Sequence, residues 1–193
     1  MNKISHLFKV SPIKGEFTHL HHVDINDADY ILKLRTEDRE DNHLMSTENS
    51  LQKQKEYLTF YKKRFELQEE IYFKVFDVAK KQFLGFVRLT EIQSKTSFGW
   101  ESAILDKSSS PNLFIDLMLM IFKIGFDYLD RDICGPWKVK KEFKKMMKIH
   151  EIIGMAEILT ENEDFYAVIV RKDRYKEKAN YFKRKNLGII KNL

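Results

Sequence analysis

The sequence is poor in cysteine, proline and glycine, and it lacks any long apolar run. Its 193 residues include one cysteine, Cys134, which excludes an intramolecular disulfide and a zinc site built on several thiolates. The longest unbroken apolar run, Leu117 to Phe122, is far shorter than the roughly 20 residues that a membrane-spanning helix needs. Residues 1–15 carry lysines but no apolar stretch typical of a secretory signal. We therefore expect a soluble, cytoplasmic protein with no membrane partner.

The composition is that of an ordinary globular chain. Lys and Arg number 34 against 29 Asp and Glu, a formal net charge of +5, and 43% of the residues are hydrophobic. The 15 Phe, 8 Tyr and 2 Trp supply bulky side chains for a core. With 3 Pro and 7 Gly and no repeat or linker, loops should be few and short. We expect a single domain over residues 1–193, with a core at about 17–175 and a basic C-terminal tail that is solvated or frayed.

Apolar periodicity predicts both strands and helices. Strands are predicted at 17–23, 71–78, 83–91, 98–105, 133–139, 156–160 and 165–171. Helices are predicted at 28–36, 50–67, 111–129 and 140–153, and residues 38–49 are expected to be irregular. Asn26 or Asp27 should cap the first helix, and Ser110 should cap the third ahead of Pro111. The order predicts an α/β fold with a mixed, mostly antiparallel sheet of about seven strands flanked by about four helices.

Four of these stretches carry a family resemblance. Phe83 to Leu89 is a strand in which a glycine is followed by alternating apolar residues, and Trp100 to Leu105 is the next strand. Ser108 to Asn112 opens a long apolar helix, and a later helix ends in His150 to Met155. In this order the chain resembles the GNAT superfamily of acyl-CoA-dependent N-acyltransferases over roughly residues 17–175. The resemblance implies acetyl-CoA as co-substrate and a reaction that needs no metal.

The resemblance also implies where acetyl-CoA binds. The pantetheine arm is expected along the strand that ends in Ile104 and Leu105. The pyrophosphate is expected at Lys107, Ser108, Ser109, Ser110 and Asn112. This loop lacks the glycines that are usual in the family. Amides at a helix N-terminus can still bind phosphate, and the hydroxyls and Lys107 can assist them.

Candidate catalytic residues follow from the needs of acetyl transfer. The attacking amine must lose a proton, and the departing thiolate must gain one. His150 stands where the family often has a tyrosine that faces the CoA sulfur, and an imidazole can donate a proton near neutral pH. Glu101 and Glu91 are the candidate bases, and partial burial of Glu101 beside Trp100 would make its carboxylate more basic. Each could instead be structural: His150 as a packing residue, and either glutamate as the partner of a lysine.

A finer resemblance concerns the acceptor. The segment Met45-Ser46-Thr47, the Trp100-Glu101 pair and residues 109–112 resemble enzymes that acetylate nucleotide-linked amino sugars for bacterial surface polysaccharides. This implies that Arg35, Met45, Ser46 and Trp100 contact the acceptor. Acetylation of a protein N-terminus or of another small amine is the alternative within the fold. A non-catalytic binding module is the alternative outside enzymes.

Two basic or histidine-rich stretches complete the candidates. Residues 137–145 are rich in lysine and could attract phosphates of CoA or of a nucleotide-sugar, or form a solvated helix face. No nucleic-acid-binding motif accompanies them, so we do not expect a nucleic acid partner. His19 and His21 alternate on a strand without a carboxylate pair nearby, so we expect no metal there. A homodimer is one of the oligomeric states that this sequence allows.

Overall fold

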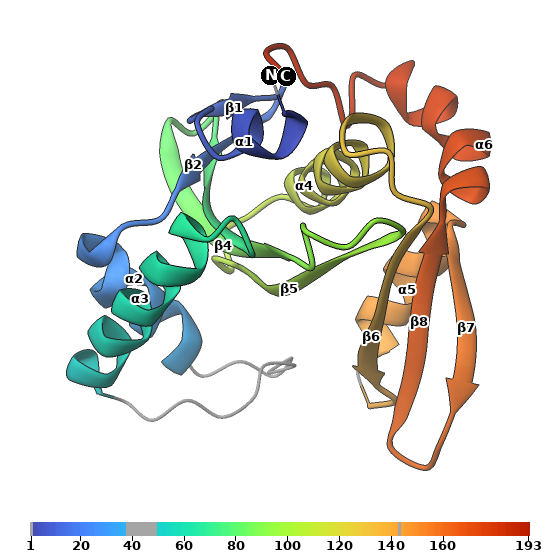
Figure 1. Ribbon diagram of the computed structural model, residues 1–193. Helices are drawn as coiled ribbons and strands as arrows, with labels where there is room; N and C mark the ends of the chain where they lie inside the picture. Colours follow the sequence, from blue (N-terminus) through green and yellow to red (C-terminus); the bar gives the residue numbers. More distant parts are fainter. Residues whose placement is uncertain (1, 38–49, 143) are drawn as a thin grey trace.

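The computed structural model describes residues 2–37, 50–142 and 144–193, and its centre is an eight-stranded sheet (Figure 1). The strands are β1 (Ile13–Lys14), β2 (Thr18–His22), β3 (Ile71–Asp77), β4 (Gln82–Thr90), β5 (Ser97–Leu105), β6 (Ile133–Lys140), β7 (Ala156–Glu161) and β8 (Phe165–Arg171). Their order in the sheet is β1-β2-β3-β4-β5-β6-β8-β7. The β5–β6 pair is parallel and every other pair is antiparallel. The mixed, mostly antiparallel α/β fold predicted from the sequence is confirmed.

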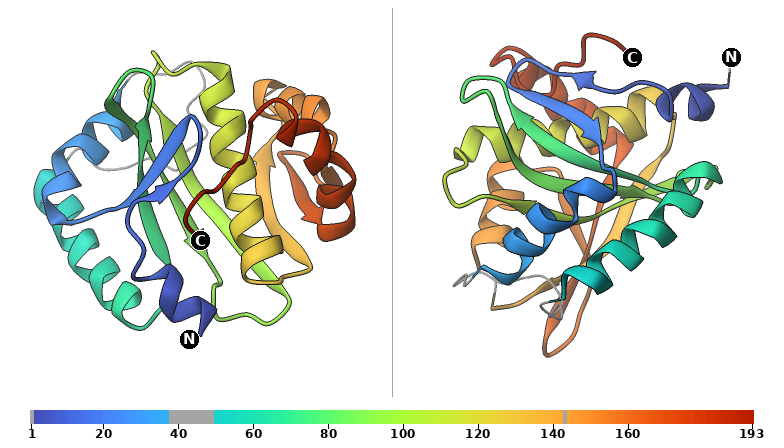
Figure 2. Two further views of the ribbon diagram at one scale, coloured as in Figure 1. Left: turned by 90° about the horizontal axis from the view of Figure 1, so that it is seen from above. Right: turned by 90° about the vertical axis from the view of Figure 1, so that its left-hand side faces the viewer.

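Helices cover both faces of the sheet. They are α1 (Lys3–Leu7), the 3₁₀ turn η1 (Ile25–Asp27), α2 (Ala28–Thr36), α3 (Leu51–Glu66), α4 (Pro111–Lys123), the π-helical segment η2 (Ile124–Tyr128), α5 (Lys144–Ile153) and α6 (Lys172–Lys183). In Figure 2, α4 lies on one side of the central strands, and α2 and α3 lie on the other. None of the helices in the described ranges combines the length and the hydropathy that crossing a membrane requires.

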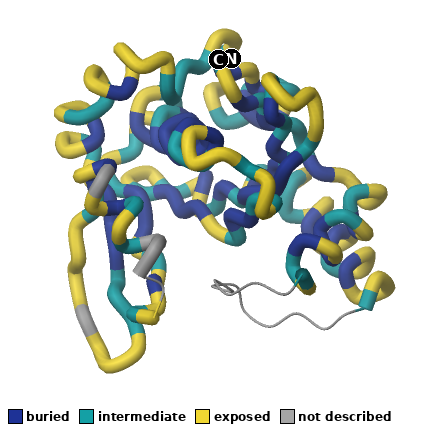
Figure 3. The backbone as a smooth tube through the Cα atoms, turned by 180° about the vertical axis from the view of Figure 1, so that it is seen from behind, coloured by how far each residue is buried: buried dark blue, intermediate teal, exposed yellow. Residues whose placement is uncertain are grey.

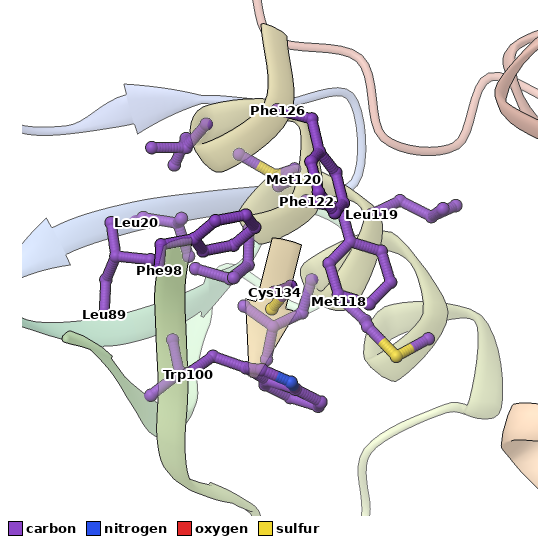
Figure 4. Close-up of a cluster of buried hydrophobic side chains, with 14 of the residues drawn as sticks. Leu20, Leu89, Phe98, Trp100, Met118, Leu119, Met120, Phe122, Phe126 and Cys134 are labelled. Carbon is purple, nitrogen blue, oxygen red and sulfur yellow. The ribbon is translucent and has the colours of Figure 1, made fainter. Parts of the chain in front are cut away.

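Helix α4 is the centre of the larger hydrophobic core. Ser110 caps it by accepting a hydrogen bond from the Leu113 amide at 3.2 Å, and Pro111 occupies its first position. Residues from Asp116 to Phe122 are all buried, which explains the helix's apolar sequence (Figure 3). Phe98 of β5 packs edge-on against Phe126 with ring centroids 5.0 Å apart (Figure 4). The β5 strand is therefore fixed against α4 and η2.

A second hydrophobic cluster lies beneath α2 and α3. Its buried members from the sheet are Tyr72, Phe86 and Ile104. Gly85 permits the close approach of β4 to β5 in this region, since a Cβ there would lie 2.2 Å from the Ile104 carbonyl oxygen. The two sides of β5 therefore face two different helical layers.

Several boundaries differ from the predictions. Two elements before residue 17, α1 and the short β1, were not predicted. Asp27 occupies the N-cap position of α2, as predicted, but its side chain makes no capping hydrogen bond there. The side-chain cap is instead Asp24, which precedes the 3₁₀ turn η1 and accepts from the Asn26 amide at 2.7 Å. The predicted helix at 140–153 begins later because Lys140 still pairs with Phe165 of β8.

The C-terminal region differs most from the sequence prediction. It is not a frayed tail: α6 buries Tyr175 and Phe182 against the larger core. Beyond α6, the Gly188 amide donates to Asp116 Oδ1 at 2.7 Å, and the Lys191 amide donates to the Lys14 carbonyl at 2.9 Å. The last residues thus connect α4 to β1, and in Figure 1 the C-terminal segment runs from α6 back over α4 towards β1.

Candidate active site

The parallel β5–β6 ladder is short. Only Ser97↔Ile133 and Phe98↔Cys134 are paired, after which the two strands are no longer bonded to each other. Gly135 and Pro136 follow the last pair, and β6 has two residues opposite one of β8 at this point, which is a β-bulge. Proline has no amide hydrogen to give to a ladder, and Gly135 has a φ of +96° that favours glycine. The sequence of β6 thus explains why the ladder ends there.

Three rings lie where the strands separate. The Trp100 ring of β5 and the Trp137 ring of β6 have centroids 5.9 Å apart, and the Trp137 and His150 rings have centroids 5.5 Å apart. Trp100 also contacts Phe114 of α4, with centroids 6.2 Å apart. Strands β5 and β6 and helix α5, which are distant in the sequence, therefore bring two tryptophans and one histidine into contact.

Polar atoms in this cluster lack the partners that burial demands. Within the described residues, Trp100 Nε1 and His150 Nε2 are buried and find no hydrogen-bond partner. His150 is only 4% exposed, and burial lowers the pKa of its imidazole to about 4. Unpaired buried groups are costly, and they often mark a ligand site. The two nitrogens fit a site for a polar ligand group between β5, β6 and α5.

The loop predicted to bind pyrophosphate joins β5 to the N-terminus of α4. Asp106 organises it by accepting the Ser108 amide at 2.8 Å on Oδ1 and the Ser109 amide at 2.9 Å on its carbonyl. Lys80, from the β3–β4 turn, donates to the Ser108 carbonyl at 2.5 Å. Ser110 Oγ is used in the helix cap, whereas Ser109 Oγ is buried without a partner in the described residues. The glycine-free loop is therefore a hydrogen-bonded turn at a helix N-terminus.

The opposite face of β5 carries an arginine-centred network, which sequence analysis missed. Arg88 of β4 donates to Glu101 Oε2 at 2.8 Å, to the Tyr57 hydroxyl at 2.7 Å and to Ser102 Oγ at 3.3 Å. Its guanidinium also lies 3.7 Å from Glu70. Arg88 is the only charged residue in Phe83–Leu89, and this was the available signal.

The structure separates the predicted site residues into groups. His150 and Trp100 lie together, whereas Glu101 lies on the other face of β5, because consecutive strand residues point to opposite faces. The Glu101 side chain is 53% exposed and bound to Arg88, so its expected partial burial beside Trp100 is not found. Glu91 lies in the turn after β4, where it accepts from Ser97 Oγ at 3.2 Å beside the still-paired end of β5.

The remaining predicted residues are placed as follows. The Ile104 side chain is buried beneath α2 and α3, so only its backbone is left to contact a cofactor. Leu105 packs on the α4 side, and both Lys107 and Asn112 are exposed. Arg35 is half-buried on α2, on the same side of the sheet as Tyr72. Met45 and Ser46 lie outside the described residues.

Within the ranges that the structure describes, no group of three His, Cys, Asp or Glu side chains is arranged to hold a metal ion. His19 and His21 instead contact aromatic rings: the His19 ring stacks on Phe76 at 5.9 Å, and His21 meets Phe83 edge-on at 5.2 Å. The lysine-rich stretch also makes aromatic contacts, with Lys138 over Phe165 and Lys141 over Tyr166.

Solved structures of other proteins share this fold, although sequence comparisons find no match. No protein-family model matches the chain, and no curated protein matches it. Among solved structures, apo FdhC, described as a nucleotide-linked sugar GNAT, aligns with a TM-score of 0.78 and 28% identity. The alignment covers 90% of this chain and 97% of FdhC.

Two further similar structures have lower identity and show the fold alone. The N-acetyltransferase PseH of Campylobacter jejuni aligns with a TM-score of 0.60 and 21% identity, covering 81% of this chain and 99% of its own. The spermidine/spermine N-acetyltransferase SpeG of Vibrio cholerae aligns with a TM-score of 0.62 and 17% identity, covering 84% and 97%. The matched folds are GNAT acetyltransferases, as the sequence motifs indicated.

Proposed function

From the premise that this chain is an acetyl-CoA-dependent N-acetyltransferase with the GNAT fold, we propose that its acceptor is the amino group of a nucleotide-linked deoxyamino sugar. The observation that carries this choice is the likeness to FdhC, which extends over 90% of the chain at 28% identity. The acetylated sugar would serve surface-polysaccharide biosynthesis.

Charge on the α3 face of the sheet also supports a nucleotide-linked acceptor over a polyamine. A polyamine is a polycation, and its binding requires carboxylates that are not already neutralised. Here Glu70 is 7% exposed and lies 3.0 Å from Arg64, while Glu101 lies 2.8 Å from Arg88. Both carboxylates are therefore paired with arginines. This balance suits an acceptor that carries phosphates better than one that carries several ammonium groups.

The proposed reaction is direct transfer in a ternary complex. The neutral amine attacks the thioester carbonyl carbon, the C–N bond forms and the C–S bond breaks. The amine proton passes to Glu101, directly or through water. The departing CoA thiolate takes its proton from solvent water, and Glu101 later returns its own proton to solvent. Cys134 is fully buried and burial raises the pKa of its thiol, so it is not offered as a nucleophile.

The two buried nitrogens, His150 Nε2 and Trp100 Nε1, would donate hydrogen bonds to the thioester. A pKa of about 4 leaves His150 neutral at pH 7, so we assign it the role of an N–H donor to the departing sulfur instead of an imidazolium acid. Trp100 Nε1, which is also buried and unpaired in the described residues, is a second donor on the same side. Ser109, Lys107 and the first amides of α4 would hold the pyrophosphate. The chemistry calls for no metal.

The test is an acceptor panel with purified protein. CoA release is followed at fixed acetyl-CoA with UDP- or dTDP-linked amino sugars, spermidine, and a peptide with a free N-terminus. Acetyl-CoA alone measures hydrolysis. We expect kcat/KM to be highest for a nucleotide-linked amino sugar. A higher kcat/KM for the peptide or for spermidine would overturn the acceptor assignment and leave the acetyltransferase assignment intact.

A further inference from the structure

Arg88 is the point at which three elements meet on the α3 face. Its side chain is 18% exposed, and its three nitrogens contact Ser102, Tyr57 and Glu101 at 3.3, 2.7 and 2.8 Å. A guanidinium presents donors in a rigid planar fork, so these contacts fix the relative positions of β4, β5 and α3. An ammonium on a flexible stem cannot reproduce this set of directions.

The contacts of Arg88 converge on a bulge in β5. In the β4–β5 ladder, Phe86 pairs with Ile104 and Arg88 pairs with Glu101, so Ser102 and Ala103 together oppose Val87. Ser102 has a φ of +51°, a left-handed conformation that is uncommon for a residue with a side chain. Ser102 and Glu101 bind the same guanidinium. Arg88 therefore holds the irregular part of β5 immediately after Trp100.

Glu101 gains a defined position from this contact. A glutamate that is 53% exposed would otherwise sample many rotamers in water. One carboxylate oxygen, Oε2, is held by Arg88 Nη2, and no hydrogen bond from a described residue reaches Oε1. Oε1 is thus available to accept a proton while the pairing of Oε2 fixes its direction.

We propose that Arg88 is a positioning residue for acetyl transfer, which acts by holding Glu101 at the β5 bulge in the direction of the acceptor amine. The inference rests on the proposed function, in which Glu101 takes the amine proton. The Arg88 guanidinium binds both Glu101 and Ser102 of the bulge. The Glu101 carboxylate and the backbone beside Trp100 therefore keep a fixed position relative to each other. In that role Arg88 touches neither the thioester nor the amine.

A double-mutant cycle separates this role from simple stabilisation. The variants are Arg88→Lys, Glu101→Gln and their combination, assayed for kcat and for the KM of acetyl-CoA. We expect Arg88→Lys and Glu101→Gln each to lower kcat by about 100-fold. The double variant should lose no more than the Glu101→Gln single variant, because Arg88 acts through Glu101. The KM of acetyl-CoA should change by less than about threefold.

Arg64→Lys is the matched control. Arg64 also pairs with Glu70, at 3.0 Å, and its guanidinium lies 5.6 Å from the centre of the Tyr57 ring. Among the described residues it forms no hydrogen bond or ion pair with Glu101 or Ser102. We expect its kcat to stay close to wild type. Losses that multiply in the double variant, or a wild-type kcat for Arg88→Lys, would overturn the proposal. The cycle uses whichever amine the wild type acetylates best, so an unexpected acceptor refutes the proposed function separately.

Discussion

At the scale of single residues, His150 shows how burial changes a chemical role. The sequence position suggested a proton donor near neutral pH, whereas the structure buries the ring and lowers its pKa to about 4. A neutral imidazole can still donate one hydrogen bond, and Nε2 has no partner in the described part of the chain. We therefore assign His150 the role of a neutral hydrogen-bond donor and not that of an imidazolium cation.

The first prediction concerns this N–H donor. His150→Phe keeps a ring beside Trp137 and removes the donor, so kcat should fall by about 100-fold while the KM of acetyl-CoA changes little. His150→Gln can place an amide near the same position and should retain more of the activity. Steady-state kinetics of both variants test this. Equal activity of wild type and His150→Phe would reduce His150 to a packing residue.

The second prediction concerns stability at acidic pH. Burial lowers the pKa of both His150 and His22 from 6.5 to about 4, so the unfolded chain binds more protons than the folded chain between these values. The stability is fully present above about pH 6.5 and declines as the pH falls towards about 4. Each histidine can contribute a slope of up to about 1.4 kcal/mol per pH unit.

Urea unfolding across pH 4–7 measures this slope for the wild type, His150→Gln and His22→Gln. Differences between curves remove the contribution of carboxylates that titrate in the same range. We expect each variant to have a shallower decline than the wild type. Parallel curves for all three proteins would show that these histidines are not buried in neutral form.

At the scale of elements, the position of Trp137 depends on where β6 leaves β5. Gly135 has a φ of +96°, and a Cβ there would lie 2.6 Å from the Trp137 ring and 2.9 Å from the Val168 carbonyl oxygen. Gly135→Ala should therefore lower stability by about 1–3 kcal/mol and displace Trp137. Denaturant unfolding and tryptophan fluorescence check both effects.

Gly154→Ala is the control for backbone strain alone. Gly154 also has a positive φ, +66°, but the nearest atom to its added Cβ would be 3.6 Å away. We expect Gly154→Ala to cost less than Gly135→Ala and to leave the fluorescence of Trp137 unchanged. If the two variants lost equal stability and had the same fluorescence, the close approach of Gly135 to Trp137 would not determine the position of Trp137.

A further element-scale prediction concerns acetyl-CoA itself. Binding should slow amide hydrogen exchange in residues 100–112, which run from the part of β5 that no longer pairs with β6 to the start of α4. At a concentration 100 times Kd, the free energy of unfolding should rise by about 2.7 kcal/mol. Exchange measured with acetyl-CoA and with desulfo-CoA separates this effect from thioester chemistry. Protection confined to other segments would place the cofactor elsewhere.

Elements with local signals could be predicted from the sequence, and those that depend on distant contacts could not. The Ser110–Pro111 start of α4 was predicted because cap and first turn are adjacent in sequence. Helix α6 was missed because its two buried aromatics, Tyr175 and Phe182, stand in a run of charged residues without a continuous apolar stripe. Its burial is decided by packing on the α4 side of the fold.

The same distinction applies to the site. His150 and Trp100 were found from motifs, but their meeting through Trp137 joins α5, β5 and β6. The burial of Glu101 was wrongly expected because its neighbour Trp100, although buried, points to the other face of the strand. Arg88 was missed because its partners lie on other elements, 31 residues away at Tyr57 and 13 at Glu101.

At the scale of the whole molecule, the sheet divides the proposed chemistry between its two faces. The buried nitrogens and the α4 N-terminus lie on the side where acetyl-CoA would bind, while Arg88 and Glu101 lie on the α3 side, where the amine would approach. The stretch of β5 that is paired with β4 but no longer with β6 separates the two groups. Acetyl transfer across this strand, from CoA to a sugar amine, is the central claim.

An internal competition tests that claim most directly. Equal concentrations of a UDP-linked amino sugar and spermidine share one limiting supply of acetyl-CoA, and mass spectrometry follows both acetylated products over time. The ratio of initial rates equals the ratio of kcat/KM values. Our account predicts that the acetylated nucleotide-sugar forms about 100-fold faster, a difference of about 2.7 kcal/mol in transition-state stabilisation. Predominant formation of acetylspermidine would contradict it.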